Sequence, residues 1–347
     1  MDEPRRVLVT RIRRIGDAIL SLPVLDALRE AFPDCAIDFL AEEGPAQAAI
    51  GHPAVDRVLV LDRTLASILP ASPRMLWRLR SRGYDWVIDL YGNPRSAVLA
   101  AWTGARVRVG PARRGRRRLY THPVPPASES LTAVEHHLRA LEILGLKSKR
   151  HAPRITLTES ERAEGRARLD ALLPAKGTPR VGVHPGNRWP AKRWPEERFA
   201  AFMKAIPRLG ARALVFAGPG EEDVARRVAA GARGSEDAPV LAGLTLRQSW
   251  SVLAALDAFV TVDGSPIHAA PAVGTPTVGI LGPTEPEIWF PYAAEDGHQL
   301  LSREIWCRPC HRHECARMDC LEWISVGDAL GALQRALAHG GGARATA

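Results

Sequence analysis

Short apolar runs alternate with helical patterns along the chain, and this alternation constrains the fold more than any other feature. The runs are rich in Val, Ile and Leu, and most are followed by a longer helical stretch. Strands that are apolar on both faces belong to parallel sheets covered by helices. The expected strands are 7–10, 36–40, 58–61, 86–90 and 106–110 in the first half, and 181–184, 213–216, 258–262 and 277–281 in the second. Each half therefore predicts one Rossmann-like α/β domain.

The length sets the expected domain count. At 347 residues the chain is longer than one ordinary domain, and two domains of about 150 to 200 residues are the natural division. A helix that begins near Ser160 ends before Pro174, and a buried strand begins at Arg180, which favours a boundary between them. We predict a first domain over 1–173, a second over 178–325, a C-terminal helix over 326–339 and a disordered tail over 340–347.

The charge points to an anionic partner. The net charge is +9 and the pI is near 9.8, which suits nucleic acid, phosphorylated lipid, an anionic membrane surface or a nucleotide. The first 25 residues lack the apolar core of a signal peptide, and no later segment reaches the roughly 20 apolar residues of a spanning helix. The sequence therefore predicts a cytoplasmic protein.

The first expected strand leads into a loop that turns at Gly16 and starts a helix at about Asp17. This loop lacks the G-x-G-x-x-G pattern of dinucleotide-binding domains, which argues against a nicotinamide dehydrogenase. An Asp that begins a helix is commonly its N-cap. The same carboxylate also follows a parallel strand, where open α/β sheets bind ligands, and is able to accept a proton from a substrate hydroxyl. Both roles stay open for Asp17.

Two loops of the second half carry features of a phosphate site. Gly186 allows backbone N–H groups to approach a ligand, and Lys192 supplies a mobile positive charge. Further along, a small-residue turn between two buried strands offers free N–H groups and a helix N-terminus to an anion. The candidate residues of this turn are Asp263, Gly264, Ser265 and His268. A solvated basic loop and a buried structural histidine are the alternatives.

A basic loop and a cysteine cluster lie outside these motifs. The loop 111–130 carries Arg113, Arg114, Arg116, Arg117 and Arg118. It either contacts the phosphates of an acidic lipid or is simply solvated, and it has few aromatic neighbours for stacking on nucleic acid. Four cysteines, Cys307, Cys310, Cys315 and Cys320, fall within 14 residues. Structural zinc, a disulfide and reduced packing thiols all fit this spacing, whereas catalytic zinc does not, because four thiolates leave no open position.

Several segments match one known family in order, over about 280 residues. They are Arg14-Ile-Gly-Asp-Ala with Leu22-Pro23, Tyr84-Asp-Trp-Val-Ile-Asp-Leu, His184-Pro-Gly, Ala191-Lys-Arg-Trp-Pro-Glu, Gly218-Pro-Gly-Glu-Glu, Asp263 to His268, and Gly282-Pro-Thr-Glu-Pro. Together they resemble glycosyltransferase family 9, the ADP-heptose-dependent lipopolysaccharide heptosyltransferases. Any one of these segments alone is weak, whereas their joint occurrence is specific.

The resemblance implies a GT-B fold, in which two Rossmann-like domains face each other across a cleft. The first domain is then the acceptor-binding one and the second binds the nucleotide-sugar donor. The implied reaction is inverting transfer of heptose from ADP-heptose to a Kdo or heptose unit of the lipopolysaccharide inner core, with no cofactor required. The acceptor is a lipid-linked, phosphorylated oligosaccharide at the cytoplasmic face of the inner membrane, and nucleic acid is not a partner.

The resemblance also implies roles for single residues. Asp17 matches the catalytic base, Lys192 matches the lysine that holds the donor phosphate, and the turn from Asp263 to His268 matches a donor-binding turn. Glu221 or Glu222 matches a ribose-binding carboxylate, with the register between them open. Arg14 and the arginine loop are then expected at the acceptor.

The turn departs from the family pattern, which reads Asp, a small hydroxylated residue, Gly, Pro, a hydrophobic residue and His. Here the middle pair is Gly264-Ser265, so Ser265 takes the usual place of Gly. If that place needs a positive φ, the strain is of order 1 kcal/mol, unless the turn shifts by one residue. A transferase of another nucleotide-sugar and a non-catalytic nucleotide-sugar or glycan-binding protein are the alternatives that follow. A zinc-stabilised nucleic-acid binder is a third class.

Overall fold

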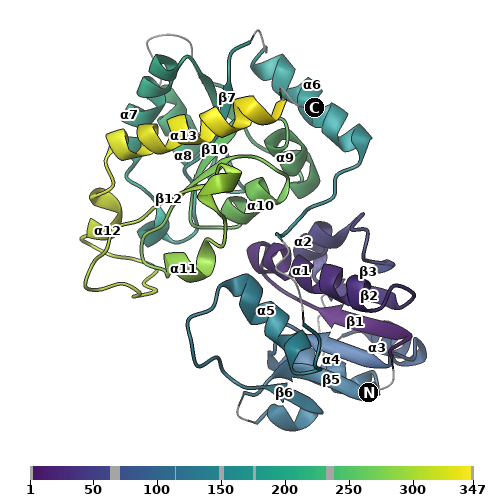
Figure 1. Ribbon diagram of the computed structural model, residues 1–347. Helices are drawn as coiled ribbons and strands as arrows, with labels where there is room; N and C mark the ends of the chain where they lie inside the picture. Colours follow the sequence, from purple (N-terminus) through teal and green to yellow (C-terminus); the bar gives the residue numbers. More distant parts are fainter. Residues whose placement is uncertain are drawn as a thin grey trace. The chain divides into compact units, whose positions relative to one another are not determined.

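The structure is a computed structural model, and it describes residues 3–62, 71–113, 115–147, 152–174, 177–231 and 238–344. The chain divides into two compact units, Met1–Thr156 and Leu157–Ala347. Each unit is built on a six-stranded parallel sheet with helices on its faces (Figure 1). The predicted fold class, two α/β units of Rossmann type, is therefore confirmed.

The first unit has the strand order β3-β2-β1-β4-β5-β6. Its strands are β1 Arg6–Thr10, β2 Ala36–Ala41, β3 Arg57–Val60, β4 Trp86–Asp89, β5 Val107–Pro111 and β6 His122–Val124. Its helices are α1 Ile15–Ala31, α2 Glu43–Ala46, α3 Pro73–Ser81, α4 Pro94–Trp102 and α5 Ala133–Glu142, with the short 3-10 turns η1 Gln47–Ala49 and η2 Arg117–Leu119. This is the Rossmann order. The order of successive strands reverses beside β1, and sheets of this kind bind their ligands at that point.

The helices α3 and α4 begin for the same local reason. The side chains of Ser72 and Asn93 each cap a helix by accepting the backbone N–H of the third helical residue. Each is followed by proline, which has no N–H and so leaves no donor unpaired at the first helical position. The inner sides of both helices, with Leu79 on α3 and Leu99 on α4, pack in one apolar cluster with the sheet residue Val87. The outer sides of the two helices are left to solvent.

The second unit repeats this order as β12-β11-β10-β7-β8-β9. Its strands are β7 Arg180–His184, β8 Arg212–Phe216, β9 Val240–Leu241, β10 Ala258–Val262, β11 Thr277–Ile280 and β12 Gln299–Leu301. Its helices are α6 Glu159–Leu172, α7 Glu196–Ala205, α8 Glu222–Ala230, α9 Leu246–Leu253, α10 Pro266–Ala272, α11 Pro286–Trp289, α12 Asp319–Glu322 and α13 Val326–Arg344, with η3 Pro190–Lys192, η4 Ile206–Leu209 and η5 Ala294–Asp296. Strand β7 here takes the central place that β1 has in the first unit.

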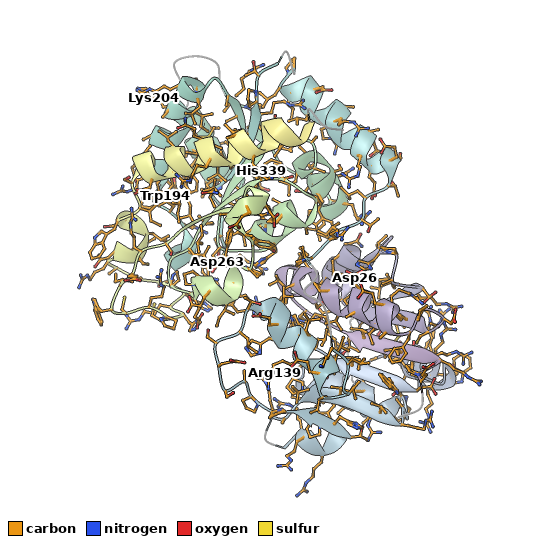
Figure 2. All side chains as sticks on the ribbon, in the orientation of Figure 1. Asp26, Arg139, Trp194, Lys204, Asp263 and His339 are labelled. Carbon is orange, nitrogen blue, oxygen red and sulfur yellow. The ribbon has the colours of Figure 1, made fainter. Side chains whose placement is uncertain are left out.

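The loop between β7 and α7 is anchored to the C-terminal part of the chain. Trp194, labelled in Figure 2, is 1% exposed, and its Nε1–H donates to the Ile324 carbonyl at 3.1 Å. Its ring packs edge-on against Phe199 of α7. The loop that carries Lys192 is therefore fixed at its far end by a buried indole.

The division between the units falls at 156/157, before the boundary expected at 173–178. The reason is helix α6, which packs along α9 of the second unit. Gly165 of α6 allows the closest approach, since a Cβ there would lie 2.1 Å from the Ser251 carbonyl oxygen. Arg247 of α9 also pairs with Glu161 of α6 at 2.5 Å. A helix that ends near a Pro-rich stretch gives no local sign of which domain it packs on.

The C-terminal helix is longer than expected. Helix α13 continues to Arg344, so residues 340–344, expected in a disordered tail, are helical, and 345–347 lie outside the described residues. Leu333 and Ala336 of this helix are fully buried in the core of the second unit. Three consecutive glycines disfavour a helix locally, and the preceding buried turns outweigh that preference here.

Candidate functional site

The turn between β1 and α1 lies earlier than the expected turn at Gly16. Its last residue before the helix, Arg14, has a positive φ, with φ 72° and ψ 112°. Helix α1 begins at Ile15, so Asp17 lies inside the first turn and is not the N-cap. The N-cap interpretation of Asp17 is therefore wrong. A non-glycine residue with such a φ costs about 1–3 kcal/mol, and strain of this kind is concentrated at functional sites.

The Asp17 carboxylate is held by a buried arginine. Its Oδ1 lies 2.7 Å from Arg11 Nη2, and the exposed fractions of the Asp17 and Arg11 side chains are 20% and 8%. The Arg11 guanidinium also lies 4.9 Å from the centre of the Tyr91 ring. Among the described residues, Arg11 Nε and Nη1 have no hydrogen-bond partner. Asp17 is thus an oriented and still accessible carboxylate at the carboxyl end of the central strand.

The arginine loop leaves β5 at the carboxyl edge of the first sheet and returns beside Arg108, near the start of the same strand. It joins β5 to β6, contains η2, and is tied down where the Tyr120 hydroxyl donates to the buried Asp89 carboxylate at 2.6 Å. Of the predicted acceptor residues in it, Arg113, Arg117 and Arg118 are exposed, Arg116 is half-buried, and Arg114 lies outside the described residues. Arg14 follows β1, which is two strands from β5 in the sheet.

In the second unit, Glu221 lies over two glycines at the carboxyl edge of the sheet. Its Oε2 is 3.0 Å from His184 Nε2 and accepts the Gly218 N–H at 3.0 Å. A Cβ on Gly186 would lie 2.4 Å from this carboxylate, so glycine alone leaves room for it. Burial raises the pKa of Glu221, but hydrogen bonds from His184 and the Gly218 N–H, together with the charges of His184 and Arg193, lower it, and the pKa is lowered overall. The neighbouring Glu222 begins helix α8 instead and is only partly buried.

Lys192 and Asp263 meet at the same edge. Lys192 Nζ lies 2.5 Å from Asp263 Oδ2, and the two side chains are 14% and 8% exposed. The same Oδ2 accepts the Thr284 hydroxyl at 2.6 Å, while Asn187 Nδ2 donates to the Asp263 carbonyl. Figure 2 labels Asp263 in the second unit. Three loops, after β7, β10 and β11, are thereby joined at one charged pair.

The Gly264-Ser265 turn is unstrained. Neither residue has a positive φ. Ser265 is the N-cap of α10, and its backbone has the right-handed helical conformation, with φ −61° and ψ −32°. The condition for strain, a positive φ at Ser265, is therefore not met, and Gly264 does not adopt the special conformation of a shifted turn. His268 is 4% exposed, and its Nδ1 lies 3.1 Å from the Tyr292 hydroxyl. Burial raises the pKa of Tyr292, so this hydroxyl keeps its proton.

A stack of aromatic rings supports Lys192, and the sequence did not reveal it. The Lys192 ammonium lies 4.5 Å from the centre of the Trp189 ring. The other ring contact of Trp189 is with His313, stacked with centroids 3.8 Å apart and an interplanar angle of 26°. The Ala191 N–H also donates to the His313 carbonyl at 3.0 Å. The cysteine-bearing segment 307–320 therefore holds the Lys192 loop, over a separation of more than 100 residues that leaves no local pattern.

The four cysteines of this segment form no disulfide in the structure and are partly exposed. Burial, and next the charges of Cys307, Cys310 and Cys315, raise the pKa of Cys320 to about 11. Backbone N–H groups, that of Met318 first, lower the pKa of Cys315. Within the described ranges, no group of three or more His, Cys, Asp or Glu side chains is arranged to hold a metal ion.

Comparison with known proteins identifies relatives over most of the chain. A model described as glycosyltransferase family 9 (heptosyltransferase) matches residues 74–320, a range that begins after the Asp17 turn. Lipopolysaccharide heptosyltransferase 1 of Pseudomonas aeruginosa is 30% identical over 323 residues, covering 89% of this chain and 87% of its own.

Solved structures share the fold. A family 9 glycosyltransferase of Veillonella parvula has a TM-score of 0.84 at 23% identity, covering 96% of this chain and 97% of its own. The ADP-heptose lipopolysaccharide heptosyltransferase II of E. coli has a TM-score of 0.79 at 21% identity, covering 96% of this chain and 98% of its own. Of the helices that the structure describes, none combines the length and apolar character needed to cross a membrane.

Proposed function

The chain belongs to glycosyltransferase family 9, and from this we propose that it transfers heptose from ADP-heptose to the lipopolysaccharide inner core, with inversion at the sugar carbon. Its membership makes it a glycosyltransferase. The named relatives support lipopolysaccharide as the acceptor class, and a structural neighbour named for ADP-heptose supports the donor. A Kdo or heptose hydroxyl is the proposed nucleophile.

The observation that carries the donor assignment is the Lys192–Asp263 pair. Both side chains are largely buried, yet among the residues that the structure describes the ammonium pairs with one carboxylate and has an indole face beside it. A diphosphate placed there gives Lys192 a second anion and neutralises charge that develops on the leaving group. Glu221, held over Gly186 and Gly218, is the proposed ribose carboxylate in preference to Glu222. The proposed donor residues also include the turn from Gly264 to His268.

Asp17 is the proposed general base. The acceptor hydroxyl attacks C1 of the sugar, the bond from C1 to the phosphate oxygen breaks, and ADP leaves with the electron pair. The hydroxyl proton passes to the Asp17 carboxylate, which Arg11 orients at 2.7 Å. A carboxylate suffices as base if C1 is strongly cationic before the new bond is complete, because the hydroxyl proton is then acidic. Attack from the face opposite ADP gives inversion.

No metal takes part in this proposal. Lys192 supplies the positive charge that a divalent cation gives in other transferases. A structural zinc at Cys307, Cys310, Cys315 and Cys320 stays a prediction, tested by metal analysis of the purified protein. We place the enzyme at the cytoplasmic face of the inner membrane, where a lipid-linked phosphorylated acceptor is reached by Arg14 and the arginine loop.

A nucleotide panel tests the donor site. ADP, UDP, GDP and CMP are titrated into the purified protein in a thermal-shift assay, with Lys192→Ala and the exposed control Lys204→Ala alongside. We expect ADP to stabilise the wild type and Lys204→Ala, and to lose most of its effect in Lys192→Ala. Stabilisation by UDP or GDP alone would replace ADP-heptose with another nucleotide-sugar. No response to any nucleotide would overturn the proposed donor site.

A further inference from the structure

The outer side of α3 and α4 exposes large apolar side chains in a regular pattern. Trp77 on α3 is 71% exposed, and Val98 and Trp102 on α4 are 41% and 50% exposed. Arg74, Trp77 and Arg78 are among the exposed positions of α3, and their spacing of three and four residues places them on one side of the helix; Pro73, Arg80 and Ser81 are also exposed. Val98 and Trp102 are four residues apart and so share one side of α4.

The two stripes are neighbours. The Trp102 Nε1–H donates to the Leu76 carbonyl of α3 at 2.9 Å, which links the end of α4 to the middle of α3. The basic turn η2 in turn contacts α4. We call the surface formed by Arg74, Trp77, Arg78, Val98, Trp102 and Arg117 the α3–α4 face.

The charge of this face has one sign. The segments 71–84, 93–106 and 111–125 contain eleven arginines and no Asp or Glu. Arg82, Arg95 and Arg106 pair with carboxylates elsewhere in the first unit. Within the part of the chain that the structure describes, Arg74, Arg78 and Arg117 have no carboxylate partner, so their charge is available to an external anion.

Exposed tryptophan beside unpaired arginine suits the boundary of an anionic bilayer. An indole is stable at headgroup depth, where its ring contacts acyl chains and its N–H stays in a polar layer. Guanidinium groups bind phosphate oxygens in a bidentate manner. The described helices include no membrane span, so a bilayer would be contacted from its surface. Nucleic acid fits less well, since Val98 and Trp102 make an apolar stripe without interleaved basic residues.

From this pattern we infer that the α3–α4 face docks the first unit on anionic phospholipid. This goes beyond the proposed reaction, because it assigns a lipid surface to the outer side of α3 and α4, which carries none of the proposed donor residues and not Asp17; Arg117 is the one residue shared with the proposed acceptor loop. Each arginine contributes about fivefold to partitioning onto such a membrane. Insertion of one indole contributes roughly tenfold.

Vesicle sedimentation tests the inference without donor or acceptor. Vesicles of phosphatidylcholine, with and without phosphatidylglycerol, are mixed with the full chain at about 0.15 M salt. We expect binding only with phosphatidylglycerol, weaker by roughly tenfold in Trp77→Ser and by more than about 25-fold in Arg74→Glu/Arg78→Glu. One matched control, Lys204→Glu/Arg208→Glu, reverses the same number of charges at the end of α7 and on η4. A second control, Trp323→Ser, removes another exposed indole. Both controls should bind vesicles as wild type does.

Three results would overturn the inference. They are absence of binding to anionic vesicles, equal loss of binding in the controls, and retardation of RNA by this face in place of vesicle binding. Thermal unfolding of every variant distinguishes loss of folding from loss of docking. If Trp77→Ser is unstable, Arg74→Glu/Arg78→Glu still tests the inference, because its substituted side chains face solvent. A variant that no longer sediments with vesicles but binds ADP normally would show that membrane docking and the proposed donor site are separate properties, so that one can be wrong without the other.

Discussion

Replacing His313 with alanine should weaken ADP binding although His313 is not itself expected to contact the donor. The His313 ring stacks on Trp189 at 3.8 Å, and Trp189 faces the Lys192 ammonium at 4.5 Å. Alanine removes one side of this stack and leaves the backbone bond from Ala191 to the residue 313 carbonyl in place. The substitution therefore tests the ring alone.

The expected magnitude follows from the ring contact. A stacked pair of this kind contributes about 0.5–1.5 kcal/mol beyond buried area, and the loss of indole position reduces a cation–π contact of about 0.5–1 kcal/mol. If the stacking energy alone holds Lys192 in place for the diphosphate, its loss raises the dissociation constant for ADP by roughly 2- to 12-fold, and the weakened cation–π contact adds to this rise. Isothermal titration calorimetry measures it directly.

Two further variants make the test specific. His313→Phe keeps a flat ring and should restore binding to within about twofold of wild type. His311→Ala lies in the same segment but pairs with Glu285 instead of stacking on Trp189, so it should bind ADP normally. The reasoning is refuted if His313→Ala binds ADP as tightly as wild type, or if His311→Ala is impaired to the same degree.

Two other predictions concern buried charge. Asp17→Ala leaves the Arg11 guanidinium without its ion pair and should lower the free energy of unfolding by about 1.5–3 kcal/mol. Adding Arg11→Met should recover part of this loss. Urea titrations of the double-mutant cycle measure both effects, and strictly additive effects would contradict the prediction. Because the pKa of folded Glu221 is below its usual 4.5, its stabilisation is present above about pH 4.5 and is lost as pH falls through the lowered value. Wild type should therefore lose stability relative to Glu221→Gln on acidification, and parallel curves would refute it.

Nine of the twelve described strands were expected, because burial on both faces follows from consecutive apolar residues, whereas the short edge strands β6, β9 and β12 were missed. Strand β10 is buried at all five positions, and its apolar run is visible without any partner. The boundary was not predictable in the same way, since α6 belongs to the second unit through Gly165 against Ser251, a contact across 86 positions. Periodicity identifies a helix and cannot say which sheet it packs on.

In the candidate site too, the residues were predictable from the sequence, whereas the contacts between distant parts of the chain were not. Residue type and order along the chain pointed to Lys192 and Asp263, which the structure joins at 2.5 Å. They did not reveal the stack on His313, because stacking needs a tertiary contact. The turn was expected at Gly16, whereas Gly16 lies in α1 and the residue with a positive φ is Arg14, a conformation that the local sequence does not favour. The roles of these residues in catalysis stay predictions.

The central claim is that Asp17 takes the acceptor proton in transfer from a nucleotide-activated heptose. The most direct measurement is the turnover of Asp17→Asn with ADP-heptose and a Kdo-lipid acceptor, with ADP affinity measured on the same preparation. The account predicts that kcat falls by about 10²- to 10⁴-fold while ADP binding stays at the wild-type value. Turnover within about threefold of wild type would contradict it, and another group would then have to accept the proton.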